Sequence, residues 1–296
     1  MSYAAAELNI LLSVLTPDGP SALELPPGLH YDVPSSVYHE KRLGIVSNSA
    51  LDKFAHSPAT YRFWVDAPEP PKTDGFALGT ALHCAALEPE EFARLYVVEP
   101  TWGDRRKTAN KEACDKWRAE NAGKVFLSEQ DMAAIQGMTA SLRAHPVLGA
   151  LLENDGRSEV TARWRDPETG LQCKARADRY CEKWSTILDL KTTDDARGSA
   201  FAHSCEKYGY DRQEALYVRG FGACDAQVEH FVFGAVEKEP PYLCAAYTLH
   251  AESVREADEI NRGLMRRMAE CLASNSWPGL QAEIQELTLR AWRMLK

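Results

Sequence analysis

The 296-residue sequence lacks the features that mark several well-defined classes of protein. It has no run of eighteen apolar residues, so no helix is expected to span a membrane. No two of its eight cysteines are spaced as CxxC, and no tight cysteine cluster occurs, which excludes a zinc ribbon, a thioredoxin-like motif and an iron–sulfur centre. Internal repeats are absent. With 45% hydrophobic and 26% charged residues, the composition is that of a globular protein with one sizeable core.

An excess of basic residues is also missing. The 34 lysines and arginines are outnumbered by 43 aspartates and glutamates, which gives a formal net charge of −9. Because phosphate groups require a basic surface, this acidity by itself argues against a nucleic-acid partner. The basic residues are unevenly placed, however, since residues 101–126 carry seven of them against four acids, a local net charge of +3.

The N-terminal stretch has an apolar segment, but it lacks a basic region ahead of that segment and a long hydrophobic centre. A secretory signal peptide is therefore not expected. We predict a cytoplasmic protein whose cysteines are reduced and mostly buried.

The pattern of the chain changes near residue 154. Residues 1–35 predict an N-terminal arm or edge element, and residues 36–296 predict a single domain whose part from 47 to 153 is helical. The part from 154 to 275 carries the sheet and further helices. Its expected strands are 158–166, 171–180, 185–193, 230–238 and 242–249, and its expected helices are 204–222 and 251–274. The order predicts an α/β fold with a mixed central sheet flanked by helices and a helical N-terminal half.

The most informative stretch reads ARADRYCEKWSTILDLKTT. If it forms a hairpin with its turn at residues 182–185, Asp178 and Asp189 are equidistant from the turn and face each other on adjacent strands. Directly opposed Cβ atoms lie about 5 Å apart. Lys191 follows Asp189 by two residues and therefore lies on the same face of the sheet.

Two opposed carboxylates on an apolar strand require an explanation, because like charges repel and Asp is unfavourable in strands. A divalent cation is the simplest one, and oxygen ligands favour Mg²⁺, with Mn²⁺ able to substitute. A lysine beside the metal can orient a water or neutralise charge on a phosphate. The alternative is a solvated strand face with a chance Asp–Lys ion pair, since the tripeptide Asp-x-Lys is common.

This arrangement resembles the PD-(D/E)XK nuclease superfamily, and further motifs narrow the resemblance to its RecB-like branch and to the RecE-type exonucleases (exodeoxyribonuclease VIII) of phages and prophages. The ordered motifs, between residues 38 and 275, are SNSALDKFAHSPATY, GTALHCAALEPEEF, YDRQEALYV and FVFGAVEKEPPY. One departure is Ala177, which stands where the superfamily's proline would be. The resemblance implies a restriction-endonuclease-like fold. It also implies that the protein is encoded by a bacterium or a phage.

The resemblance also implies roles for individual residues. Asp178, Asp189 and the backbone carbonyl of Leu190 would bind the metal, with His83 completing the shell from a neighbouring helix. Lys191 would position or deprotonate the attacking water.

Gln213 and Tyr217, one helical turn apart, resemble the pair that lines the DNA channel in the catalytic site. Each assignment has a structural alternative. His83 can be a core histidine, and Tyr217 can simply pack in its helix. Glu159 can also reach the metal, although an edge-strand surface acid is the favoured interpretation. Ser49 can bind a terminal phosphate, although a plain helix cap is favoured.

The basic segment is the best candidate for contacts with the DNA backbone, with two tryptophans available to stack on bases. The alternative is a solvated loop and helix face. The candidate residues are Arg105, Arg106, Lys107, Trp102 and Trp117.

The predicted function is a Mg²⁺-dependent exonuclease of linear double-stranded DNA. The resemblance further implies 5′→3′ digestion that leaves 3′ single strands for recombination, a ring-like homo-oligomer and a single-strand annealing partner protein. The alternatives are a structure-specific endonuclease of the same fold, a DNA-binding or assembly module without catalysis, and a Mg²⁺-dependent hydrolase of small phosphate esters.

Overall fold

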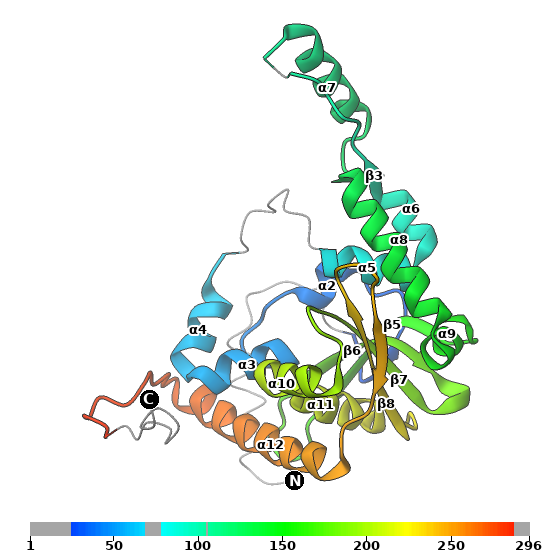
Figure 1. Cartoon of the computed structure of the whole chain (residues 1–296). Coiled ribbons are helices and arrows are strands. Elements are labelled where there is room, and N and C mark those ends of the chain that lie inside the picture. Colours follow the sequence, from blue (N-terminus) through cyan, green and yellow to red (C-terminus); the bar gives the residue numbers. More distant parts are fainter. Residues whose placement is uncertain (1–24, 69–77, 105, 287–296) are drawn as a thin grey trace, which may run out of the picture.

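A mixed seven-stranded sheet forms the centre of the molecule in the computed structural model, which describes residues 25–68, 78–104 and 106–286 (Figure 1). The strand order is β1-β5-β6-β7-β8-β9, with β2 also paired to β6. The strands are β1 (Gly28–His30), β2 (Ile45–Val46), β5 (Arg157–Arg165), β6 (Gln172–Cys181), β7 (Thr186–Thr193), β8 (His230–Glu237) and β9 (Cys244–Tyr247). The predicted mixed α/β fold is confirmed.

Helices occupy most of the N-terminal half and alternate with strands afterwards. They are α2 (Ser35–His39), α3 (Asn48–His56), α4 (Pro58–Asp66), α5 (Leu78–Leu87), α6 (Pro89–Leu95), α7 (Thr108–Glu120), α8 (Glu129–Ala144), α9 (Pro146–Glu153), α10 (Gly198–Tyr208), α11 (Tyr210–Ala223) and α12 (Ala251–Ser274). The prediction for 251–274 is confirmed, but the helix predicted for 204–222 is two helices joined at Gly209, whose φ of 65° is left-handed.

Side-chain caps explain where the first helices begin. The Ser47 hydroxyl accepts a hydrogen bond from Ala50 N at the start of α3. Ser57 does the same for Thr60 N, and Pro58 takes the first position of α4, where its missing N–H costs nothing. Pro58 therefore begins a second helix instead of only ending the first.

The hairpin of β6 and β7 has the predicted turn and register. Residues 182–184 form a short 3₁₀ turn, and Ser185 adopts a left-handed conformation with φ of 44°. Arg179 pairs with Leu188, which is the register that sets Asp178 opposite Asp189. The apolar pattern of β7 follows from burial on both faces, because Ile187 packs with one hydrophobic core and Leu188 with the other.

The two cores lie on opposite faces of the sheet. Side chains of α3, α11 and α12 pack on one face, and side chains of α5, α8 and α9 pack on the other. The end of the predicted arm contributes β1, which pairs antiparallel with β5, whereas residues 1–24 lie outside the described part of the chain.

A projecting arm, which is distinct from the N-terminal arm predicted for residues 1–35 and is called the arm from here on, interrupts the helical half. Two short parallel strands, β3 (Tyr96–Val98) and β4 (Val125–Leu127), form its base and carry α7 away from the sheet (Figure 1). None of the described helices combines the length and apolar character needed to cross a bilayer. All eight cysteines lie in the described part, and none forms a disulfide.

Close packing of α11 on β5 depends on a glycine. A methyl group at Gly220 would collide with the ring of Trp164, which is 4% exposed and cannot move aside. We expect Gly220→Ala to lower the free energy of unfolding by about 1–3 kcal/mol, the usual cost of overpacking. Gly222→Ala is the matched control in the same helix, because a methyl group there meets no atom within 4 Å. It should leave stability unchanged or raise it by up to about 1 kcal/mol in urea denaturation.

Candidate active site

A closed set of three polar side chains links β7 to α11. Asp189 is 1% exposed and makes an ion pair with Lys191 through Oδ2. Lys191 Nζ donates to Gln213 Oε1 at 3.0 Å, and Gln213 Nε2 donates to Asp189 Oδ1 at 2.5 Å. Each group thus holds the other two, so the carboxylate and the ammonium are fixed in position before any substrate binds.

Asp178 lies beside this set at a point where the sheet opens. The register places it opposite Asp189, but backbone pairing of β6 with β7 stops at Arg179 and Leu188. The Asp178 carboxylate instead accepts a hydrogen bond from Leu190 N at 2.7 Å. The side chain therefore replaces a backbone ladder bond, and the two strands separate around the carboxylates.

Glu159 belongs to the same cluster, contrary to the favoured interpretation of a surface acid on an edge strand. It lies in β5 between β1 and β6, its φ of 53° is left-handed, and its Oε2 is 3.5 Å from Arg176 Nη1. Burial, reinforced by the charge of Asp178, raises the pKa of Glu159 to about 7. The interpretation as an edge-strand acid is wrong, because β5 pairs with β1 on one side and β6 on the other, and Glu159 lies near enough to Asp178 for that charge to raise its pKa.

His83 reaches the cluster from α5. Its Nδ1 lies 3.5 Å from Asp178 Oδ2, and its side chain is 30% exposed. The alternative of a buried core histidine is therefore wrong, since the ring faces the carboxylates at the edge of solvent. The resemblance-based expectation that His83 accompanies Asp178 is consistent with this position.

The electrostatics of the cluster favour a cation. The pKa of Asp189 is raised to about 6, because burial and the charge of Asp178 together outweigh the opposite effect of Lys191. Burial alone would lower the pKa of Lys191, but the nearby Asp189 and Asp178 outweigh it, and the net pKa is raised. Lys191 is thus charged at neutral pH. Its single positive charge does not balance the acidic side chains around it, so a bound cation would be favoured there.

The donor set fits a hard divalent cation, since it offers two carboxylates, a backbone carbonyl at Leu190 and one imidazole. Within the described ranges, no three His, Cys, Asp or Glu side chains are already arranged as a metal site. Asp189 is engaged by Lys191 and Gln213 instead. A bound cation would therefore have to compete with Lys191 for that carboxylate.

Tyr217 extends the polar network along α11, one turn beyond Gln213. It is 7% exposed and lies close to Tyr38 and Gln213. Burial raises the pKa of its hydroxyl well above the ordinary value, so it remains protonated. Tyr38 is not predictable as a neighbour of Tyr217 from the sequence, because α2 lies far from α11 in the chain.

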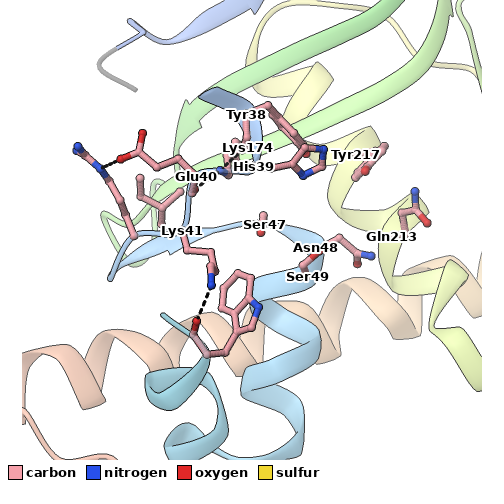
Figure 2. Close-up of a pocket in the computed structure, with 13 residues that line it drawn as sticks. Tyr38, His39, Glu40, Lys41, Ser47, Asn48, Ser49, Lys174, Gln213 and Tyr217 are labelled. Atoms are coloured by element: carbon pink, nitrogen blue, oxygen red, sulfur yellow. Dashed lines mark hydrogen bonds and ion pairs between the residues drawn. The ribbon is translucent and has the colours of Figure 1, made fainter. Parts of the chain in front are cut away.

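A pocket of about 260 Å³ opens beside Gln213 and Tyr217 (Figure 2). Ser49 lines it from the first turn of α3, but Ser47 is the residue that caps the helix. Lys174 lines the opposite wall and is 5% exposed, with its ammonium bonded to the carbonyls of Tyr38 and Glu40. Burial lowers the pKa of Lys174 to about 8, which leaves it largely charged at neutral pH.

The basic segment lies on the arm and away from this cluster (Figure 1). Trp102 donates its indole N–H to Glu99, and its ring meets Trp117 edge-on at 6.1 Å. Trp117 in turn lies 5.2 Å from Phe126, so both tryptophans form the small core of the arm. Arg106 and Lys107 are exposed, and Arg105 lies outside the described residues.

Comparison with known proteins identifies a family. The family described as a PDDEXK-like domain of unknown function (DUF3799) matches residues 47–288. No curated protein matches the sequence. A solved structure from Eubacterium rectale, provisionally described as an exonuclease, shares 12% identity over 89% of this chain and 96% of its own, with a TM-score of 0.56. At that identity the likeness supports the fold alone.

A phage-related exonuclease from Haemophilus somnus is also similar, at 14% identity over 60% of this chain and 90% of its own, but its TM-score of 0.30 is too low to establish a common fold.

The carboxyl group of Glu214, next to Gln213, has an unusual environment. It is 8% exposed, and no hydrogen bond is found for its Oε2. Burial, followed by the charges of Asp189 and Asp211, raises its pKa to about 8. The side chain is therefore mostly neutral at pH 7.

This raised pKa predicts a pH-dependent stability. Because the folded state holds the proton more tightly than the unfolded state, stability falls as the pH rises from about 4.5 to about 8. Glu214→Gln removes this loss, so the variant should gain about 1–3 kcal/mol over the wild type between pH 5 and pH 8.5. Urea denaturation at several pH values measures it, with Glu259→Gln, at an exposed position of α12, as the control. Parallel pH curves for wild type and Glu214→Gln would contradict the assignment.

Proposed function

Since the chain belongs to the PDDEXK-like family DUF3799, we propose that it is a metal-dependent nuclease that hydrolyses phosphodiester bonds in DNA. The observation that carries the proposal is the set of Asp189, Lys191 and Gln213 with Asp178 and His83 around it. A buried carboxylate of raised pKa, such as Asp189, beside a charged lysine is typical of catalytic sites.

The chain's own groups have distinct tasks in this proposal. A divalent cation held by Asp178, Asp189, the Leu190 carbonyl and His83 supplies charge that stabilises the reacting phosphate. Lys191, whose pKa the neighbouring Asp189 and Asp178 raise, orients the attacking water or the phosphate oxygen as a hydrogen-bond donor in this proposal. Gln213 holds Lys191 and Asp189 in one geometry. Because these groups are already ordered, the reaction does not incur the entropy cost of ordering them.

The finer proposal is a Mg²⁺-dependent exonuclease that digests linear duplex DNA from the 5′ end and leaves 3′ single strands for recombination. It is supported by the resemblance to RecE-type exonucleases and by the exonuclease description of the Eubacterium rectale structure. The pocket beside Gln213, with Ser49 and Lys174 in its walls, offers a place for the end of a strand. A ring-like oligomer and a single-strand annealing partner complete the proposal.

The arm is a second proposed DNA contact. Its exposed Arg106 and Lys107 carry charge suited to the phosphate backbone, whereas Trp102 and Trp117 stabilise the arm itself. The arm would hold duplex DNA at a distance from the site without reading its sequence.

Substitution of the central set tests catalysis. With linear duplex DNA and Mg²⁺, Asp189→Ala and Lys191→Ala should each lower kcat by about 100-fold or more, because the first removes a proposed metal ligand and the second removes the cation that orients the water or phosphate. Lys183→Ala is the matched control, since Lys183 is exposed in the turn of the same hairpin, and it should cleave at the wild-type rate. An inactive wild type, or full activity in both site variants, would contradict the proposal.

The form of the substrate separates the rival functions. A closed circular duplex should resist the enzyme and a linear one should not, whereas a structure-specific endonuclease would cut a circle carrying its target structure. A module without catalysis would cut neither. On end-labelled duplex, early release of the 3′ label would contradict the 5′→3′ direction.

His83 allows the metal to be tested separately from the lysine. His83→Ala should raise the Mg²⁺ concentration for half-maximal cleavage by about 10- to 100-fold, because a ligand beside Asp178 is lost. Isothermal titration with Mn²⁺ should show the same weakening without substrate. An unchanged metal dependence would exclude His83 from the metal shell.

A further inference from the structure

A second pocket, of about 210 Å³, lies at the end of β7 and shares no lining residue with the pocket of Figure 2. The hydroxyl residues that follow Lys191 in β7, together with α10 and the first residue of α11, line it. The lining residues that matter are Thr192, Thr193, His203, Lys207, Tyr208 and Tyr210.

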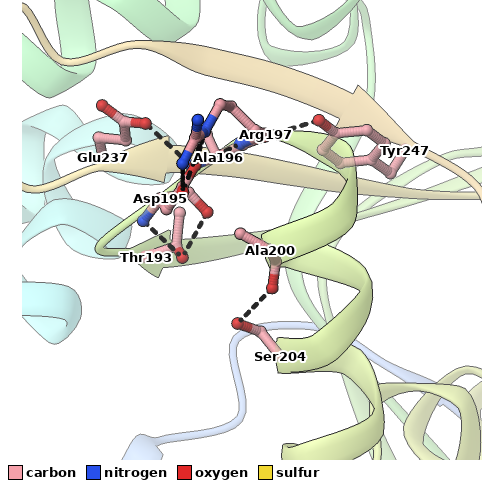
Figure 3. Close-up of polar contacts among 8 residues, drawn as sticks. All are labelled: Thr193, Asp195, Ala196, Arg197, Ala200, Ser204, Glu237 and Tyr247. Carbon is pink, nitrogen blue, oxygen red and sulfur yellow. Dashed lines mark hydrogen bonds and ion pairs between the residues drawn. The ribbon is translucent and has the colours of Figure 1, made fainter.

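The wall of this pocket is held rigidly (Figure 3). Thr193 donates its hydroxyl to Asp195 O at 3.0 Å, and the Asp195 carboxylate accepts from Arg197 N at 2.9 Å. Ala196 N donates to Glu237, and Tyr247 donates its hydroxyl to Ala196 O at 2.6 Å. The pocket is therefore preformed, and Asp195 is already engaged by Arg197.

A column of aromatic rings connects this pocket to the catalytic lysine. Lys191 Nζ lies 4.6 Å from the ring of Tyr210, which is stacked on Phe233 at 5.8 Å and 21°. Tyr208 is stacked on Tyr210 at 5.8 Å and 27°. The left-handed turn at Gly209 is what brings two tyrosines from successive helices side by side.

Tyr208 is the exposed end of the column. It is 54% exposed, so a large ring faces solvent on a rigid support. Lys207 Nζ lies 5.0 Å from its centroid, and the flexible stem of that lysine lets the ammonium turn to a phosphate when another group approaches the ring. At the rim, Asp194 is paired with Lys238 at 2.6 Å, which reduces its repulsion of a phosphate.

We propose that this pocket binds a nucleobase of the DNA strand, stacked on Tyr208, with Lys207 on the adjacent phosphate. A preformed pocket, an exposed ring and a neighbouring cation are the elements by which proteins bind single-stranded DNA without sequence preference. The proposal rests on the proposed nuclease function and deepens it, because the stack would hold the strand next to Tyr210, the ring that Lys191 contacts.

Fluorescent aminopurine provides the test. We would place it at successive positions from the end of a linear duplex and measure binding in Ca²⁺, a substitute ion for an oxygen-rich site that should permit binding without rapid cleavage. The wild type should quench the probe at one position near the cleaved bond. Tyr208→Phe should retain the quenching, whereas Tyr208→Leu, which keeps an apolar side chain without a ring face, should lose it and bind roughly 5- to 100-fold more weakly.

Trp184→Ala is the matched control, because Trp184 is 41% exposed in the hairpin turn and should have no effect on quenching. Equal quenching and affinity in wild type and Tyr208→Leu would overturn the proposal, as would loss of quenching in Tyr208→Phe. Cleavage in Mg²⁺ tests the stacking site separately from the proposed nuclease function. If the wild type cleaves DNA and Tyr208→Leu matches it in KM, the stacking site is wrong while the nuclease function remains.

Discussion

Burial of Asp189 beside Asp178 is the constraint around which the rest of the site is arranged. Two carboxylates in the interior of a sheet repel each other and lose hydration, and burial holds the pKa of Asp189 near 6 in spite of Lys191. The surrounding groups offset this cost through hydrogen bonds and an ion pair. Gln213 and Lys191 bond to one carboxylate, and Leu190 N bonds to the other. A sheet selected for stability alone would place apolar residues here.

Those parts of the structure that depend on local pattern were predictable. The turn and register of the β6–β7 hairpin follow from the positions of turn residues relative to the two aspartates, and the observed pairing of Arg179 with Leu188 agrees. The amphipathic pattern of residues 251–274 likewise predicts α12 with its bounds. In both cases the relevant contacts are close in sequence or repeat with the helical period.

Those parts that depend on distant contacts were not predictable. The sequence alone favours a surface acid at Glu159, because it does not place the neighbouring β6 and α5 beside this residue. Tyr38 joins Tyr217 only because α2 lies over the sheet. The break at Gly209 had a local signal, a glycine within a helical pattern, but glycine is tolerated inside helices often enough to conceal it.

The overall acidity of the chain is also less informative than it first seems. Three of its acids are gathered around one site where they favour a cation, and part of its basic charge is carried on an arm that stands away from the sheet (Figure 1). Net charge averages over these regions and so conceals both of them.

Helix α11 has a geometrical consequence for any strand that crosses the site. It begins at Tyr210, presents Gln213 to Asp189 and Lys191 in its first turn and reaches Tyr217 in its second. Seven residues of α-helix span about 10 Å. A DNA strand bound as proposed would therefore meet two pockets whose separation along α11 is set by backbone hydrogen bonds and not by the flexibility of side chains.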